Sequence, residues 1–140
     1  MLVNYLFKEV MKGMVARESG HIINLSSIAG KQTYPNGNVY CASKAAVEAL
    51  SAGMRLDLNP FGIKVSNVAP GAVSTEFSDV RFKGDSAKAA SVYAGYEPLV
   101  AEDVADLIRY IVVAPAHVNI ADVTILPKAQ ASAFQILRKN

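Results

Sequence analysis

Tyr40 and Lys44, four residues apart, are the residues of this sequence best suited to acid–base chemistry. On a helix this spacing places both side chains on one face, with the lysine ammonium beside the phenol. A neighbouring cation favours the phenolate, so it lowers a pKa that starts near ~10 and makes the phenol a usable proton donor or acceptor. A buried aromatic residue beside a surface lysine would show the same spacing, so the pair alone does not decide the function.

Two serines, Ser26 and Ser27, form a second candidate group upstream of this pair. Ser27 lies thirteen residues before Tyr40 and directly follows residues 21–26, which predict a short buried strand centred on Ile22, Ile23 and Leu25. A hydroxyl at the carboxyl end of a strand can hydrogen-bond a substrate oxygen, whereas a loop serine more commonly satisfies its own backbone. The position of Ser27 ahead of Tyr40 favours the functional interpretation.

The residues around these candidates alternate between helical and strand patterns. Leucine, valine and methionine recur every four residues from Leu2 to Met14, which follows one face of a helix. Three helices are expected, over residues 2–17, 38–58 and 101–114. Three strands are expected, over residues 21–26, 63–69 and 122–126. Residues 70–97 form an irregular connection that is longer than most, and such loops are often functional lids.

This alternation predicts βαβ units with a parallel sheet, in which a right-handed crossover carries the first strand through the long helix to the second. Ligands bind such sheets beyond the carboxyl ends of the strands. Residues 26–30 follow the first expected strand, and residues 70–75 follow the second. We therefore expect the functional site between these two segments.

Three segments, in this order, resemble the short-chain dehydrogenase/reductase family: Asn24-x-Ser26-Ser27-x-x-Gly30, Tyr40-Cys41-Ala42-Ser43-Lys44 and Pro70-Gly71-Ala72-Val73-Ser74-Thr75. Further segments are similar to one group in that family, the NADP-dependent 3-hydroxy acid dehydrogenases, which include serine and allo-threonine dehydrogenases. They are Gly37-Asn38-Val39-Tyr40, the stretch 75–85 and Pro115-Ala116-His117-Val118-Asn119-Ile120. The resemblance covers the chain from Leu6 onward.

The resemblance implies three catalytic residues, Ser27, Tyr40 and Lys44. Tyr40 would act as the general acid/base. Lys44 would lower the pKa of Tyr40 and hold the ribose hydroxyls of the nicotinamide cofactor. Ser27 would bind the substrate, orient its reacting oxygen and stabilise the charge that develops there, with Ser26 as the weaker candidate.

The resemblance also implies a cofactor wall and a substrate clamp. The residues that would wall the nicotinamide are Pro70, Gly71, Val73 and Thr75, with Thr75 reaching its carboxamide. Arg81 would grip a substrate carboxylate as a bidentate fork, although an exposed lid arginine held in water is the alternative. The implied cofactor is NADP, with NAD possible, because the residue that selects between them lies outside the matching part of the family.

Glycine spacing limits how much of the family fold the chain supplies. The nine glycines are never closer than seven residues apart, so the glycine-rich turn that binds a pyrophosphate is absent from the sequence. We therefore expect residues 1–140 to form a single partial domain of the α/β class. This domain is the C-terminal part of a Rossmann-type doubly wound parallel sheet, with about three strands and flanking helices.

Two functions are compatible with these observations. The first is an NAD(P)-dependent oxidoreductase that transfers a hydride between a nicotinamide and a small alcohol or carbonyl, with a 3-hydroxy acid as the expected substrate. The second is a truncated, catalytically inactive remnant that acts only through subunit association. In the family, the helices that flank the serine strand pair across a dimer axis, so the full-length form is expected to be a homo-oligomer, either a dimer or a tetramer.

Composition excludes several other classes of protein. The formal charge of +2 comes from scattered residues, which leaves no basic stripe for nucleic acid. One cysteine, Cys41, and two histidines cannot build a zinc site or a disulfide framework, so no metal is expected. No uncharged run approaches the ~18 residues of a membrane span, and Lys8, Glu9 and Lys12 interrupt any signal peptide. We expect a cytoplasmic protein that acts on a small molecule.

Overall fold

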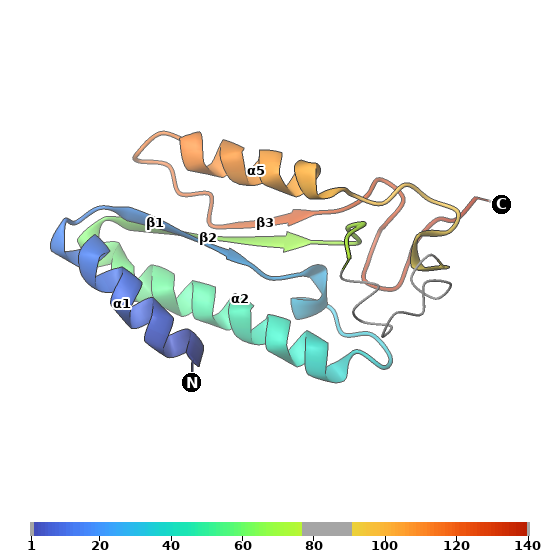
Figure 1. Ribbon diagram of the computed structural model, residues 1–140, viewed down its shortest axis with the longest axis horizontal. Coiled ribbons are helices and arrows are strands. Elements are labelled where there is room, and N and C mark those ends of the chain that lie inside the picture. The colour runs from blue at the N-terminus through green and yellow to red at the C-terminus, as the bar shows by residue number, and fades with distance from the viewer. Residues whose placement is uncertain (1, 77–90, 140) are drawn as a thin grey trace.

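The computed structural model describes residues 2–76 and 91–139 of the chain. Its three strands are parallel and lie in the order β1 (Gly20–Leu25), β2 (Ile63–Pro70) and β3 (Asp122–Ile125). Helices α1 (Leu2–Ala16) and α2 (Asn38–Leu58) lie on one face of the sheet, and α5 (Ala101–Val113) covers the other (Figure 1). Helices on both faces of a parallel sheet confirm the predicted fold class.

The predicted helices and strands agree with the structure to within one residue at each end. β1 begins at Gly20, one residue earlier than expected, because Gly20 pairs with Ile63 of β2. β2 continues to Pro70, one residue later than expected, because Pro70 pairs with Ile125 of β3. After α2 the chain turns at Gly62, whose φ of 66° lies in the left-handed region that favours glycine.

Two apolar cores flank the sheet, one under each helical layer. The core on the side of α1 and α2 consists of Ile22, Met54, Leu58, Ile63 and Val65, with Met11, Met14 and Val15 of α1 packed against it. The core on the side of α5 is formed around Val68, Val104 and Ile111. Strand β2 therefore contributes side chains to both cores, which is typical of the central strand of a parallel sheet.

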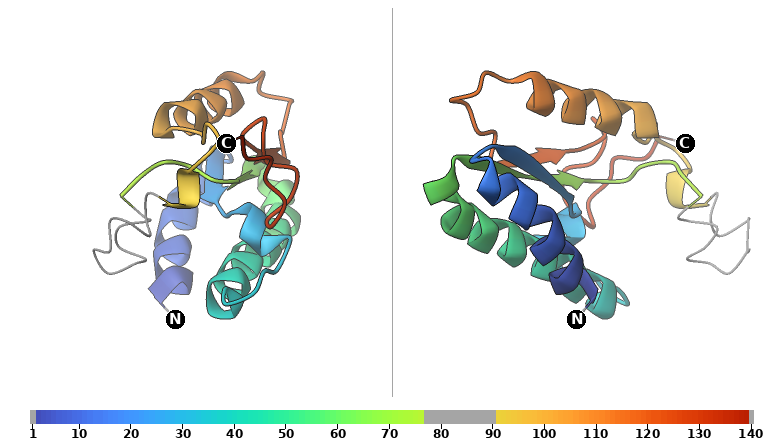
Figure 2. Two further views of the ribbon diagram at one scale, coloured as in Figure 1. Left: turned by 90° about the vertical axis from the view of Figure 1, so that its right-hand side faces the viewer. Right: turned by 60° about the vertical axis from the view of Figure 1, so that its left-hand side comes forward.

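The carboxyl ends of all three strands point toward the same end of the molecule. The segment that follows β2 and the segment that follows β3 both lie at this end (Figures 1 and 2).

Within residues 2–76 and 91–139, no helix has both the length and the apolar character needed to cross a bilayer. In the same residues, no group of three His, Cys, Asp or Glu side chains is placed to hold a metal ion.

Candidate functional site

The segments that follow β1 and β2 lie side by side at the carboxyl ends of the strands. The backbone N–H of Ser26 donates to the Val68 carbonyl over 2.8 Å, which extends the contact between the two strands by one residue. The Ser27 hydroxyl lies 3.4 Å from the Pro70 carbonyl oxygen. Residues 26–30 and 70–75, between which the sheet topology predicted the site, therefore face each other.

The hydroxyls of the two serines have different partners. The Ser26 hydroxyl donates its single proton in a hydrogen bond to the Glu48 carboxylate over 2.5 Å. Ser27 Oγ accepts the Ala29 N–H over 3.1 Å, and its own proton is directed at the Pro70 carbonyl over a long, weak hydrogen bond. Ser27 can therefore turn its proton toward a substrate oxygen at little cost, whereas Ser26 is held by Glu48.

Gly30 brings the turn after Ser27 against helix α2. This turn is a short 3₁₀ helix, η1 (Ile28–Gly30). A Cβ atom at Gly30 would lie 2.8 Å from both the carbonyl carbon and the carbonyl oxygen of Lys44. Because glycine has no Cβ, the two backbones can approach this closely. Gly30 therefore sets the separation between Ser27 and the part of α2 that carries Lys44.

Tyr40 and Lys44 lie in the first turns of α2, on one face of the helix. The Lys44 ammonium lies 5.8 Å from the centroid of the Tyr40 ring, within the range of a cation–π contact. It also donates a hydrogen bond to the Leu25 carbonyl over 3.2 Å. The end of β1 therefore fixes the ammonium beside the phenol ring, as the four-residue spacing predicted.

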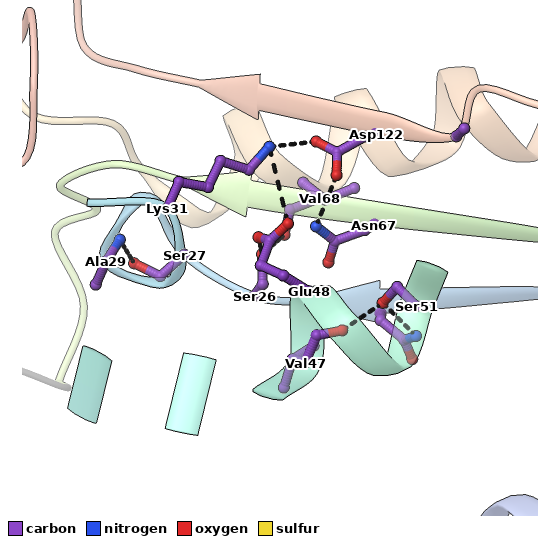
Figure 3. A network of polar contacts seen from close by, with 12 residues as sticks. Ser26, Ser27, Ala29, Lys31, Val47, Glu48, Ser51, Asn67, Val68 and Asp122 are labelled. Atoms are coloured by element: carbon purple, nitrogen blue, oxygen red, sulfur yellow. Dashed lines mark hydrogen bonds and ion pairs between the residues drawn. The ribbon is translucent and has the colours of Figure 1, made fainter. Parts of the chain in front are cut away.

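A network of charged and polar side chains joins β2, β3, α2 and the segment after β1 (Figure 3). Lys31 forms an ion pair with Asp122 of β3 and a longer one, at 3.9 Å, with Glu48 of α2. Glu48 accepts the Ser26 proton, and Asn67 Nδ2 donates to Asp122 over 3.3 Å. Burial opposes ionisation of Asp122, but the hydrogen bonds and charge of Lys31 and the bond from Asn67 outweigh it and hold the pKa of Asp122 below its ordinary value.

Residues 70–75, here called the wall, run beside the candidate catalytic side chains. Ser74 N–H donates to the Leu99 carbonyl over 2.7 Å, and Leu99 N–H donates to the Ala72 carbonyl over 3.0 Å. The Tyr93 hydroxyl donates to the Val73 carbonyl over 2.8 Å. The wall is therefore held in place by residues 93–99, which follow it by about 20 residues in the sequence.

A cavity of about 580 Å³ opens between the wall, η1 and the start of α2. It is lined by every predicted site residue that the structure describes: Ser27, Tyr40, Lys44, Pro70, Gly71, Val73 and Thr75. Arg81 lies outside the described residues. The described lining includes two cations, Lys44 and Arg138, and no carboxylate. Its charge therefore favours an anionic ligand.

The segment after β3 contributes lining residues that the sequence did not predict. Gln130 accepts the Ala72 N–H over 2.9 Å. Arg138 donates to the backbone carbonyls of residues 91, 92 and 94 and lies 5.2 Å from the centroid of the Tyr96 ring. Burial raises the pKa of the Tyr96 phenol above its ordinary value, and the Arg138 charge acts in the opposite direction. No periodic pattern or motif in the sequence marks these residues.

The cavity lining has the chemistry needed to hold the nicotinamide end of a dinucleotide. Pro70 and Val73 offer apolar surface to a flat ring, and Thr75 offers a hydroxyl to its carboxamide. Tyr40 and Lys44 offer polar groups to ribose hydroxyls. The described lining contains no carboxylate that would repel the cofactor phosphates. These residues therefore fit the group that the sequence resemblance implies.

Residues 3–86 match the short chain dehydrogenase family. The NADP-dependent 3-hydroxy acid dehydrogenase of Escherichia coli K12 is 44% identical over 130 residues, which make up 92% of this chain and 52% of that protein. Sulfoacetaldehyde reductase 2 of Chromohalobacter salexigens is 47% identical over 118 residues, which make up 84% of this chain and 47% of that protein.

The fold is also similar to solved structures. The closed form of serine dehydrogenase complexed with NADP+ superimposes with a TM-score of 0.89 at 42% identity, over 97% of this chain and 55% of that chain. The chain therefore spans about half the length of the relatives that it matches.

Proposed function

The chain belongs to the short-chain dehydrogenase family, and on that premise we propose that it carries the proton-transfer part of an NADP-dependent oxidoreductase. The proposed reaction interconverts a small alcohol and its carbonyl compound. The observation that supports this proposal is the meeting of Ser27, Tyr40 and Lys44 with the wall in one cavity. NADP is the proposed cofactor because relatives at 44% and 46% identity are named as NADP-dependent.

When bound, the nicotinamide supplies or accepts the hydride. The chain's own residues bind the reacting oxygen and move its proton. Ser27 donates a hydrogen bond to that oxygen, turning its proton away from the Pro70 carbonyl 3.4 Å away. Tyr40 gives a proton to the oxygen in the reducing direction and takes it back in the oxidising direction. Lys44, fixed by the Leu25 carbonyl, keeps a positive charge beside the Tyr40 ring and binds the ribose hydroxyls.

The proposed substrate carries an acidic group and belongs to the 3-hydroxy acid class. Relatives are named for 3-hydroxy acids, sulfoacetaldehyde and serine, all of which carry a carboxylate or a sulfonate. The two cations in the described cavity lining, Lys44 and Arg138, support an anionic substrate for this chain as well. Arg81, outside the described residues, is proposed to bind the acidic group as a bidentate fork.

Replacing Tyr40 by phenylalanine tests the proposed role of the phenol. The change removes the oxygen that transfers the proton and keeps the ring beside Lys44. Oxidation of a 3-hydroxy acid by NADP+, followed by NADPH absorbance, is expected to slow by about 100-fold or more. Tyr110→Phe is the matched control, because Tyr110 is an exposed residue of α5 outside the cavity. Full activity of Tyr40→Phe would contradict the assignment.

Association without catalysis is a second candidate function, and exposed apolar side chains on two helices favour it. Large apolar side chains are exposed on α1 and α2 at Val10, Val39, Leu50 and Leu56. Their exposure supports a homo-oligomer, either a dimer or a tetramer, with the two helices in contact between subunits. Light scattering combined with the activity assay separates the two functions, since a stable but inactive oligomer would support the second.

The lone thiol of Cys41 supports a reducing, cytoplasmic location.

A further inference from the structure

Gln130 is a buried glutamine in the segment after β3, with 7% of its surface exposed. Its Oε1 atom accepts the Ala72 N–H over 2.9 Å, and its Nε2 atom donates to the Ser132 carbonyl over 3.0 Å. The side-chain amide therefore uses both of its ends and connects the wall to the C-terminal segment. An amide bonded at both ends is held in one orientation, since reversing it would place donor against donor.

This amide also explains why residue 71 is a glycine. Among the described residues, the glycines with positive φ are Gly62 and Gly95, so the backbone of Gly71 is in a region open to other residues. A Cβ atom at Gly71 would lie 2.2 Å from Oε1 of Gln130 and 2.8 Å from Cδ2 of Leu126. Two non-bonded atoms cannot approach so closely, so the absence of a side chain at Gly71 allows the Gln130 amide to reach the Ala72 N–H.

Ala72 differs from its neighbours in the wall in how its N–H is bonded. The N–H of Gly71 donates to the Ile125 carbonyl over 2.8 Å, and the N–H of Ser74 donates to the Leu99 carbonyl. The N–H of Ala72, between them, is bonded by the side chain of Gln130. A substitution at residue 130 therefore changes the support of the wall and leaves its main-chain hydrogen bonds in place.

We propose that Gln130 is a positioning residue of the wall, which it holds at Ala72 in the conformation that receives the nicotinamide. Gln130 lines the same cavity as Lys44 and Thr75. It acts through the backbone of Ala72 and not on the reacting oxygen, so its loss weakens binding of the nicotinamide ring. The nature of the ligand rests on the proposed function, whereas the hydrogen bond to Ala72 exists without any ligand.

Three variants of the full chain test this role. Gln130→Met keeps the length of the side chain and removes both hydrogen-bonding ends. Gln130→Glu keeps an acceptor oxygen for the Ala72 N–H and loses the donor to the Ser132 carbonyl. Arg55→Met is the matched control, because the Arg55 guanidinium also bonds distant backbone, the carbonyls of Val65 and Ala121, and is not among the cavity-lining residues.

Two quantities are measured by NMR for each variant. The first is the hydrogen-exchange rate of the Ala72 amide. The second is the dissociation constant for reduced nicotinamide mononucleotide, the part of the cofactor that the wall would contact. Gln130→Met is expected to raise both by about tenfold or more, and Gln130→Glu to keep the exchange rate within about threefold of the unaltered chain. The glutamate carboxylate would line the cavity and repel the phosphate of the nucleotide, so binding in Gln130→Glu is expected to stay weakened. Arg55→Met is expected to change neither.

Recovery in Gln130→Glu separates positioning of the wall from a general structural role, because the bond to Ser132 is lost in both variants. Unchanged Ala72 exchange in Gln130→Met would overturn the inference, whether or not the nucleotide binds. Equal effects of methionine and glutamate on Ala72 exchange would overturn it as well. If the unaltered chain fails to bind the nucleotide while Ala72 exchange responds, the cofactor assignment is overturned and the support of the wall by Gln130 is upheld.

Discussion

Replacing Gly30 by alanine tests whether the contact between η1 and α2 is a fixed part of the site. A Cβ atom at residue 30 would lie 2.8 Å from the carbonyl carbon and oxygen of Lys44, and 3.1 Å from the nitrogen of Ala45. Ordinary van der Waals contact begins at 3.4 Å, so relief requires a shift of about 0.6 Å (3.4 − 2.8). All these atoms belong to the backbone of α2, and therefore no side-chain rotation removes the clash.

The expected cost follows from this required displacement. Forcing an additional carbon into a packed contact costs about 1–3 kcal/mol, and each kcal/mol lowers the Tm of a chain of 140 residues by roughly 3–5 °C. Gly53→Ala is the matched control, because Gly53 lies within α2 and a Cβ atom there would meet nothing within 4 Å. Alanine is favoured over glycine inside a helix by about 0.5–1 kcal/mol. The same substitution is therefore expected to have opposite signs at the two positions.

Thermal unfolding followed by circular dichroism measures both changes in stability. Activity gives a second measurement, because moving η1 away from α2 also moves Ser27 away from Tyr40 and Lys44. Misplacement of a catalytic group by ~1 Å can cost about 100-fold in rate, so Gly30→Ala is expected to lose activity while it remains folded. A Gly30→Ala chain as stable as the unaltered one would refute the reasoning, since η1 would then not be held against α2.

Three further predictions follow from contacts elsewhere in the fold. Gly71→Ala is expected to destabilise the chain by about 1–3 kcal/mol. In a Gln130→Ala background the same change should cost at least about 1 kcal/mol less, because the clashing amide is gone. Denaturant unfolding of the unaltered chain, the two single variants and the double variant measures this coupling. Burial and the charge of Lys64 lower the pKa of His21 below 6.5, so the unfolded state binds the proton more tightly and stability falls as the pH drops through that value. Urea midpoints at about pH 7.5 and about pH 5.5 should therefore differ less in His21→Gln than in the unaltered chain. Arg138→Ala removes hydrogen bonds to the carbonyls of residues 91, 92 and 94 and should speed exchange of the neighbouring Lys139 amide, whereas unchanged exchange would show that Arg138 does not hold this segment.

The elements that carry the catalytic candidates were predictable because their signals are local. Helix α2 begins at Asn38 and ends at Leu58 as expected, since Pro60 and Gly62 follow its last residue. The common face of Tyr40 and Lys44 follows from helix geometry alone. The alternation of helices and strands was sufficient to predict a parallel sheet and to place the site at its carboxyl end.

The other side of the site was not predictable because its contacts join distant parts of the chain. Gln130 bonds Ala72 across 58 residues, and Tyr93 bonds Val73 across 20. Contacts at such separations leave no periodic pattern, and residues 126–139, which the structure describes after β3, contain no regular helix or strand that would place their side chains. The sequence marks Gly71 as part of a motif, but the reason for the glycine is the close approach of Gln130 and Leu126, which becomes visible once the chain is folded.

The site is divided between regular elements that hold the catalytic candidates and irregular segments that close the cavity around them. Ser27, Tyr40 and Lys44 lie at the end of β1 and the start of α2, where the Leu25 carbonyl and the contact of η1 with α2 limit their movement. Residues 91–99 and 127–139 close the cavity from the other side and include Arg138. Proton transfer requires sub-ångström positioning, whereas loops tolerate substitution. In the proposed enzyme, substitutions in these two segments should therefore change which acid fits before they change proton transfer. Gln130 is the exception, because its amide reaches from an irregular segment to the backbone of the wall.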